Sequence, residues 1–256
     1  MGAGETLAGR HALVTGGGTG VGAALALAFA EAGARVSVVG RREAPLAEVA
    51  ERHPAIAACP GDVTGEASVA AFFAAARDRH GPVDVALVNA GVAESAPFAK
   101  STLAHFEKHV TVNLTGAFLT AREAVPSMVE RGFGRLVFVA STAGLVGYPY
   151  VTAYCAAKHG VVGLTKSLGR ELAGTGVTAN ALCPGYVETP MLERTLANIT
   201  KATGRDEAAA RKTLLRATPL GRFTEPAEVA AAALYFASDA AAAVTGTTLS
   251  ISGGEV

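Results

Sequence analysis

The sequence has few cysteines, no net charge and no obvious membrane segment. Its three cysteines, Cys59, Cys155 and Cys183, form no Cys-x-x-Cys pair, which argues against a disulfide framework or a thiolate zinc site. Lys plus Arg and Asp plus Glu both total 22, so no strong field attracts nucleic acid or an anionic membrane. We therefore expect a cytoplasmic protein with a small-molecule partner and no metal, nucleic acid or membrane.

The longest uncharged stretch, residues 136–157, is long enough to cross a bilayer. It is interrupted by Ser141, two glycines and Pro149, which are typical of a loop. The pattern therefore predicts a strand followed by a loop.

Short apolar runs alternate with helical patterns along the 256 residues. The runs predict strands at 10–15, 35–39, 56–59, 83–88, 135–140, 177–182 and 247–251, and the helical patterns cover 21–32, 45–52, 69–80, 102–131, 152–173 and 225–237. Strands that are apolar throughout belong to a parallel sheet covered on both faces. We predict one α/β domain over 1–256, a doubly wound parallel sheet of Rossmann type with helices on both faces. The polar, helical segment 188–219 is expected to cover a site.

A glycine-rich turn follows the first predicted strand and leads directly into a helix. Glycines let the backbone approach a pyrophosphate closely, and the helix N-terminus offers free N–H groups and a positive dipole end. This pattern predicts a dinucleotide site that includes Thr15, Gly16, Gly18, Thr19, Gly20, Val21 and Gly22.

The end of the second predicted strand indicates which dinucleotide binds. A carboxylate there would hold the adenosine ribose 2′-hydroxyl, but the sequence has Gly40 followed by Arg41 and Arg42. Two guanidiniums favour a 2′-phosphate, and hence NADP. NAD remains open, because the two arginines also fit the solvated start of a helix.

Tyr154 and Lys158 are four residues apart and so share one face of a predicted helix. A nearby ammonium favours the phenolate, so the pair suits proton exchange between a phenol and a carbonyl or alcohol oxygen. Ser141 follows a predicted strand at the edge where such sheets bind ligands. Its hydroxyl can hydrogen-bond the same substrate oxygen.

With these motifs in order, the chain resembles the short-chain dehydrogenase/reductase family over nearly its whole length. The matching motifs are the turn at 15–22, Asp62-Val63, Asn89-Ala90-Gly91, Asn113, Ser141, Tyr154 with Lys158, and Pro184-Gly185. The resemblance implies that Tyr154 is the general acid/base, that Ser141 orients the substrate oxygen and that Lys158 binds the nicotinamide ribose and lowers the pKa of Tyr154. Asn113 would hold a water on a proton path to Lys158.

The same resemblance supplies further cofactor contacts. Asp62 and Val63 would contact the adenine, and Asn89, Ala90 and Gly91 would line the cofactor cleft. Pro184, Gly185, Val187 and Thr189 would lie near the nicotinamide. Two positions depart from the family: Thr19 stands where NADP users often carry a basic residue, and Val88 replaces a frequent asparagine.

Residues 158–191 look like those of 3-oxoacyl-thioester and polyketide ketoreductases. We therefore expect NADPH-dependent reduction of such a ketone, linked to coenzyme A or a carrier protein. The bases that would meet such a phosphate are Lys201, Arg205, Arg211, Lys212 and Arg216. The alternatives are an NAD-dependent dehydrogenase of a hydroxy acid or cyclic alcohol, and a non-catalytic NADP-binding regulator.

The resemblance also implies a homotetramer, with residues 247–256 at one interface. His105 and His109 are four apart on a predicted helix but do not form a zinc-protease motif. We interpret them as surface or interface histidines.

Overall fold

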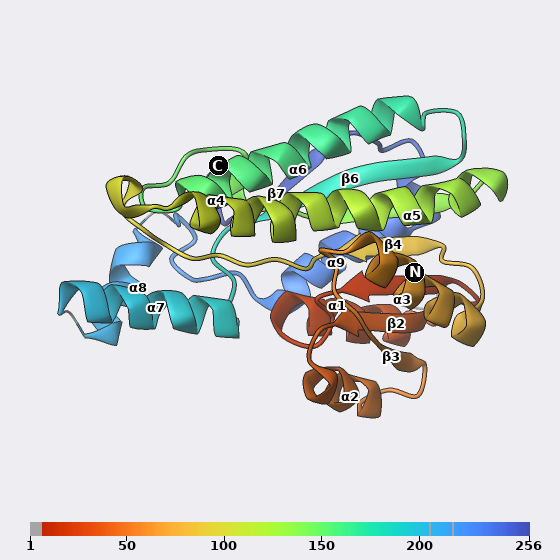
Figure 1. Cartoon of the computed structure of the whole chain (residues 1–256), viewed down its shortest axis with the longest axis horizontal. Coiled ribbons are helices and arrows are strands. Elements are labelled where there is room, and N and C mark those ends of the chain that lie inside the picture. The colour runs from red at the N-terminus through yellow and green to blue at the C-terminus, as the bar shows by residue number, and fades with distance from the viewer. Residues whose placement is uncertain (1–6, 205, 217) are drawn as a thin grey trace.

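Within residues 7–204, 206–216 and 218–256, which the computed structural model describes, seven strands form one parallel sheet (Figure 1). The strands are β1 (His11–Thr15), β2 (Arg35–Gly40), β3 (Ile56–Pro60), β4 (Val85–Val88), β5 (Gly134–Val139), β6 (Val177–Pro184) and β7 (Thr248–Ile251). Their order is β3-β2-β1-β4-β5-β6-β7. The order reverses between β1 and β4, so the carboxyl ends of these two strands open a crevice where ligands bind in such folds.

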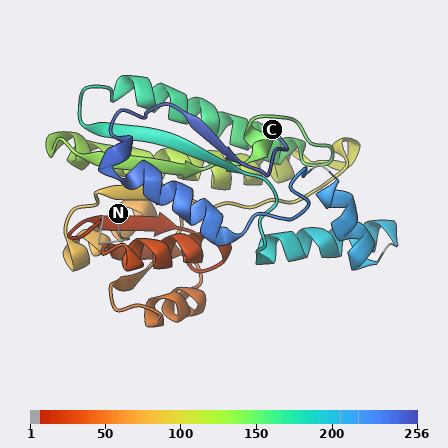
Figure 2. The ribbon, with the colours of Figure 1, turned by 180° about the vertical axis from the view of Figure 1, so that it is seen from behind.

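Helices cover both faces of the sheet, as Figures 1 and 2 show from opposite sides. On one face, α1 (Gly20–Glu31), α2 (Glu43–Glu51) and α9 (Pro226–Ala237) pack over a core that includes Leu25, Phe29 and Phe236. On the other, α3 (Glu66–His80), α5 (Gly116–Glu130) and α6 (Thr152–Glu171) pack over Phe72, Phe138 and Met128. The central strands are buried on both sides, which is why they read as continuous apolar runs. The predicted doubly wound fold is confirmed.

The helix predicted over residues 102–131 has an internal change of hydrogen-bond register. It consists of α4 (Leu103–His109), a π-helical stretch η2 (Val110–Thr115) and α5, which contains Pro126 and continues to Glu130. All junction residues keep helical backbone angles, so the three parts form one run. Stretches of π-helix are rare and often occur at functional sites. Here the stretch carries Asn113.

Segment 188–219 contains two helices, α7 (Pro190–Thr203) and α8 (Glu207–Leu215). They lie beyond the carboxyl edge of the sheet, on the left in Figure 1. A small separate core of Leu192, Leu196, Ala210 and Phe223 holds them together. Short 3-10 turns lie at Phe98–Lys100 (η1), Thr142–Gly144 (η3) and Asp239–Ala241 (η4). Every helix in the described part of the chain is too short or too polar to span a bilayer.

A buried histidine stands at the start of β1. The Nδ1–H of His11 donates to the carbonyl of Gly81 (2.8 Å), and Nε2 accepts from the hydroxyl of Ser37 (2.9 Å). The side chain is inaccessible to solvent, and burial lowers the pKa of His11 from 6.5 to about 4. The folded protein therefore keeps this imidazole neutral.

This pKa predicts a stability loss in mild acid. Below pH 6.5 His11 of the unfolded chain binds a proton, whereas the folded protein binds it only near pH 4, so the free energy of unfolding falls as the pH drops through this range. We expect a loss of about 2 kcal/mol between pH 7 and pH 5 in urea unfolding. In His11→Asn the free energy of unfolding should fall by at most half as much over the same pH range. An equal fall in this variant would show that His11 is not the group responsible.

Candidate cofactor and catalytic site

A cavity of about 480 Å³ opens at the carboxyl edge of the sheet, between the glycine turn, the start of α6 and α7. Most of the residues expected in the site line it: Gly16, Thr19, Gly20, Val21, Gly22, Arg41, Arg42, Asn89, Ala90, Gly91, Asn113, Ser141, Tyr154, Lys158, Pro184, Gly185, Val187 and Thr189. Gly18, Asp62 and Val63 line a second cavity that shares Gly16, Thr19 and both arginines with the first. The fold thus gathers residues from most of the chain in one crevice.

Thr15 lies elsewhere than expected. It is fully buried and lines neither cavity. Its hydroxyl accepts hydrogen bonds from the backbone N–H groups of Asn89 (3.0 Å) and Ala90 (3.1 Å). Thr15 therefore holds the loop after β4 against the turn after β1.

The geometry of the glycine turn fits a pyrophosphate. Gly16 and Gly20 have positive φ angles of 67° and 54°, which side-chain-bearing residues rarely adopt. A Cβ on Gly22 would lie 2.1 Å from the carbonyl oxygen of Gly16. At the start of α1, Thr19 makes no capping hydrogen bond with its side chain, and the first turn holds no acidic residue. The N–H groups of this turn are therefore available to an anion.

The adenosine end of the crevice carries positive charge. Arg41 and Arg42 are both exposed and line both cavities, next to Gly40. Asp62 is the one carboxylate among the described residues that line the two cavities. Its Oδ1 already accepts from the backbone N–H (3.0 Å) and the hydroxyl (2.9 Å) of Thr64. The site therefore suits a 2′-phosphate at this end.

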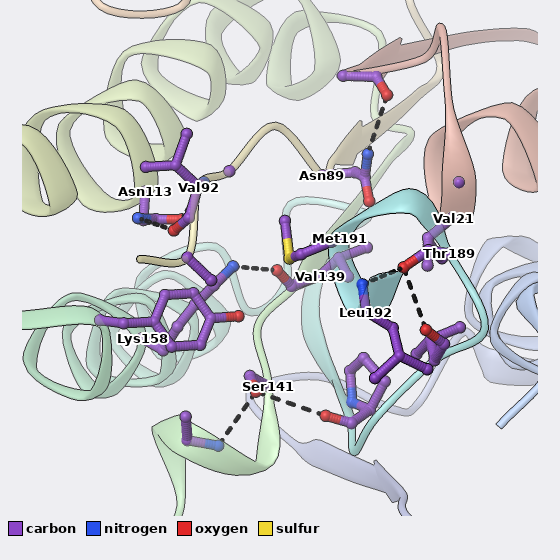
Figure 3. Close-up of a pocket in the computed structure, with 18 of the residues that line it drawn as sticks. Val21, Asn89, Val92, Asn113, Val139, Ser141, Lys158, Thr189, Met191 and Leu192 are labelled. Carbon is purple, nitrogen blue, oxygen red and sulfur yellow. Dashed lines mark hydrogen bonds between the residues drawn. The ribbon is translucent and has the colours of Figure 1, made fainter. Parts of the chain in front are cut away.

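Ser141 and Tyr154 meet at the opposite end of the crevice. Ser141 follows β5, where its Oγ accepts from the N–H of Ala143 (3.1 Å) and donates to the carbonyl of Pro184 (3.5 Å; Figure 3). Burial raises the pKa of Tyr154 to about 12, while a hydrogen bond with Ser141 acts in the opposite direction. The phenol is therefore a proton donor at neutral pH, with Ser141 beside it.

Lys158 lies one helical turn after Tyr154, with its Nζ 5.7 Å from the centroid of the tyrosine ring. The ammonium donates to the carbonyl of Val139 at the end of β5 (2.8 Å; Figure 3). Burial lowers the pKa of Lys158 to about 8. The structure brings the two groups together, but burial and not Lys158 dominates the pKa of Tyr154.

Asn113 occupies the π-helical stretch η2 and is buried. Its Oδ1 accepts from the N–H of Val92 (3.1 Å), and its Nδ2 donates to the carbonyls of Val92 and His109 (both 3.0 Å). Its Oδ1 lies close to Gly91, where a Cβ would be only 2.7 Å away from it, and Lys158 Nζ would be 3.7 Å from the same Cβ. Asn113 thus fixes the loop after β4 beside Lys158.

Several lining residues were not identified from the sequence. They belong to loops and to α7: Val92, Ala93, Tyr148, Val151, Tyr186, Arg194 and Thr195. No motif marks them, since their positions depend on how the loops cross the sheet edge. The prediction of His109 as a surface or interface histidine is wrong. His109 is fully buried, whereas His105 is half-buried.

A substitution at Gly22 tests the turn geometry. In Gly22→Ala the new methyl group would meet the Gly16 carbonyl and the Asn89 amide, so the turn must open. We expect dinucleotide affinity to fall at least tenfold in a fluorescence titration. Gly163→Ala is the matched control, because its Cβ would meet nothing within 4 Å in α6, and it should bind normally. Unchanged binding by Gly22→Ala would contradict the proposed cradle.

Comparisons with known proteins agree with this geometry. The sequence profile of the short chain dehydrogenase family matches residues 10–200. D-beta-hydroxybutyrate dehydrogenase of Rhizobium meliloti is 36% identical over 251 residues, which cover 95% of this chain and 97% of that protein. A crystal structure of a variant actinorhodin polyketide ketoreductase with NADPH superposes with a TM-score of 0.93 at 37% identity, covering 96% and 97% of the two chains. Levodione reductase gives a TM-score of 0.91 at 35% identity, covering 97% and 98%. The chain belongs to the short-chain dehydrogenase/reductase family of oxidoreductases.

Proposed function

We propose that this protein reduces the ketone of a 3-oxoacyl or polyketide-like substrate with NADPH. The observation that carries the proposal is the convergence of Ser141, Tyr154 and Lys158 in the cavity that also contains the glycine turn. The NADPH-bound actinorhodin ketoreductase, at 37% identity, supports the choice of substrate class and cofactor.

The proton chemistry belongs to the chain's own side chains. The nicotinamide, when bound, supplies the hydride to the carbonyl carbon. Tyr154 gives the proton of its phenol to the carbonyl oxygen, and the hydroxyl of Ser141 donates a hydrogen bond to the same oxygen. The phenol's raised pKa keeps this proton in place until the oxygen gains charge. In the reverse direction Tyr154 accepts the proton of the alcohol.

Lys158 and Asn113 support that transfer. Lys158 lines the cavity and is held by the carbonyl of Val139, and its ammonium would bind the nicotinamide ribose. A cation here favours the phenolate that remains after transfer. Asn113 lies beside Gly91 and Lys158 and would hold the water through which Tyr154 regains its proton.

The substrate end of the cavity is bordered by the start of segment 188–219. Met191 and Leu192 of α7 line it together with Tyr186 and Val151. We propose that this segment covers the substrate. Arg194 lines the cavity and suits a coenzyme A or carrier-protein phosphate better than Arg211, which pairs with Glu188 at 2.6 Å. Arg205 lies outside the described residues.

We propose a cytoplasmic homotetramer, supported by the exposed apolar side chains and the free thiols. Apolar side chains are exposed around α4 and α5, notably Phe98, Leu103 and Phe118, and again at Tyr235 and Leu249 near α9 and β7. Two separate apolar faces suit the two isologous interfaces of a homotetramer. The three cysteines are free and buried, in keeping with the reducing cytoplasm.

A second candidate function rests on the D-beta-hydroxybutyrate dehydrogenase relative. In that case the chain would oxidise a hydroxy acid or cyclic alcohol with NAD. A non-catalytic NADP-binding regulator is the third candidate, although it has no need of a complete Asn113, Ser141, Tyr154 and Lys158 set.

The two arginines separate NADP from NAD. In Arg41→Ala/Arg42→Ala the 2′-phosphate would lose its charge-assisted hydrogen bonds, so NADPH affinity should fall about 10- to 100-fold. NADH affinity should stay within about threefold, because NADH lacks this phosphate. Arg52→Ala, an exposed arginine that lines neither cavity, is the control. Tighter binding of NADH than NADPH by the unmodified protein would overturn the cofactor assignment.

A turnover screen tests the reaction itself. We expect NADPH-dependent reduction of 3-oxoacyl thioesters, with weaker activity on cyclic and aryl ketones. Tyr154→Phe removes the proton donor and should lower kcat by at least about 100-fold with dinucleotide affinity retained. Oxidation of hydroxy acids with NAD alone would favour the second candidate. Equal activity of Tyr154→Phe would refute the mechanism.

A further inference from the structure

His109 stands out because it is a polar side chain buried where an apolar one would be expected. It is the last residue of α4 and the only one of that helix that is buried. Its imidazole has no access to solvent, whereas Lys108 before it is exposed. Burying a polar ring is unfavourable unless its nitrogens are hydrogen-bonded. The partners of His109 therefore indicate its role.

Both ring nitrogens have backbone partners. Nδ1 lies 2.8 Å from the carbonyl oxygen of His105, and Nε2 lies 3.0 Å from the backbone nitrogen of Glu94. An amide N–H can only donate and a carbonyl can only accept, so the proton must sit on Nδ1 and Nε2 must be the acceptor. The network thus specifies one neutral tautomer.

Through this acceptor His109 holds residues 91–94, which we name the pocket strip. Asn113 binds the N–H and the carbonyl of Val92 in this strip, and His109 binds the N–H of Glu94 two residues further on. Gly91, Val92 and Ala93 line the main cavity. The strip is therefore attached to the α4–η2 run by three hydrogen bonds to its backbone and by the ion pair of Lys108 with the Glu94 side chain (2.6 Å). His109 holds the backbone at the far end of the strip.

His109 also adjoins the proposed proton donor. Its ring meets the ring of Tyr154 edge to face, with 6.4 Å between centroids and 76° between planes. Its own carbonyl accepts from the amide of Asn113. One residue thus contacts Tyr154, Asn113 and the pocket strip.

We propose that His109 is a positioning residue that, as the Nδ1–H tautomer, fixes the pocket strip through Glu94 and so aligns Asn113 and Lys158 with Tyr154. The inference rests on the proposed roles of those three residues. It assigns His109 no contact with the substrate. It predicts that losing the Nε2 acceptor lowers turnover while dinucleotide binding at the glycine turn is preserved.

Two amide substitutions separate the two hydrogen bonds of the ring. In His109→Gln, Oε1 is as many bonds from Cα as Nε2 of histidine, so it can still accept from Glu94. In His109→Asn, the amide matches Nδ1 only and leaves the Glu94 N–H without its acceptor. We expect His109→Asn to lower kcat about tenfold, and His109→Gln to keep it within about threefold. Dinucleotide Kd should be unchanged in both.

The control is His159→Asn. His159 makes the same ring-to-carbonyl contact, with Cys155 at 2.9 Å, but it is exposed on α6 and lines neither cavity. The kcat of His159→Asn should equal that of the unmodified protein. Wild-type kcat in His109→Asn, or equal losses in both His109 variants, would overturn the proposal.

A measurement that needs no turnover completes the test. Long-range ¹H–¹⁵N correlation spectra of the unmodified protein should show the His109 proton on Nδ1 at pH 7. A proton on Nε2 would overturn the proposal even if His109→Asn does not fold. If the proposed function were wrong, Tyr154→Phe would keep its turnover. This result differs from a proton on Nε2 of His109, so failure of the proposed function and failure of the His109 proposal are distinguishable.

Discussion

The close contact between the turn after β1 and the loop after β4 is the constraint on which the site depends. The side-chain amide of Asn89 donates to the carbonyls of Thr15 and Gly16, and the Thr15 hydroxyl accepts from the loop in return. This contact is possible because Gly22 has no side chain to fill the space. Since it lies where the strand order reverses, it shapes the crevice in which the two ends of a dinucleotide would lie.

The opposite end of the crevice is built from buried polar groups that are all held by backbone atoms. Lys158 is fixed by Val139, Asn113 by Val92, and His109 by His105 and Glu94. Such groups are unfavourable in a dry interior unless they are hydrogen-bonded, and when bonded they are rigid. Burial also sets their protonation, keeping Tyr154 protonated and bringing the pKa of Lys158 down to about 8. Fixed positions and protonation states set by burial suit a site that moves one proton.

Much of the fold and site could be predicted because the relevant signals are local. Continuous apolar runs indicate buried parallel strands, and the glycine turn indicates a phosphate cradle, without knowledge of any distant contact. The elements at 102–131 were less predictable. The π-helical stretch η2 leaves no pattern in the sequence, since a one-residue change of hydrogen-bond register alters no propensity. The hydrogen bonds of Thr15 to Asn89 and Ala90, and the bond of buried His109 to Glu94, join residues that are distant in the sequence or lie in loops. No local pattern predicts them.

The sequence by itself determined the doubly wound architecture, the dinucleotide turn and the spacing of Tyr154 and Lys158, because each depends on residues close together in the chain. Only the tertiary structure decided which groups surround them. Thr15 became a support for the Asn89 loop, Arg211 an ion-pair partner of Glu188, and His109 a buried neighbour of Tyr154. The tertiary structure also decided the protonation states of the buried groups. A pKa depends on desolvation and on nearby charges, and packing at the sheet edge fixes both.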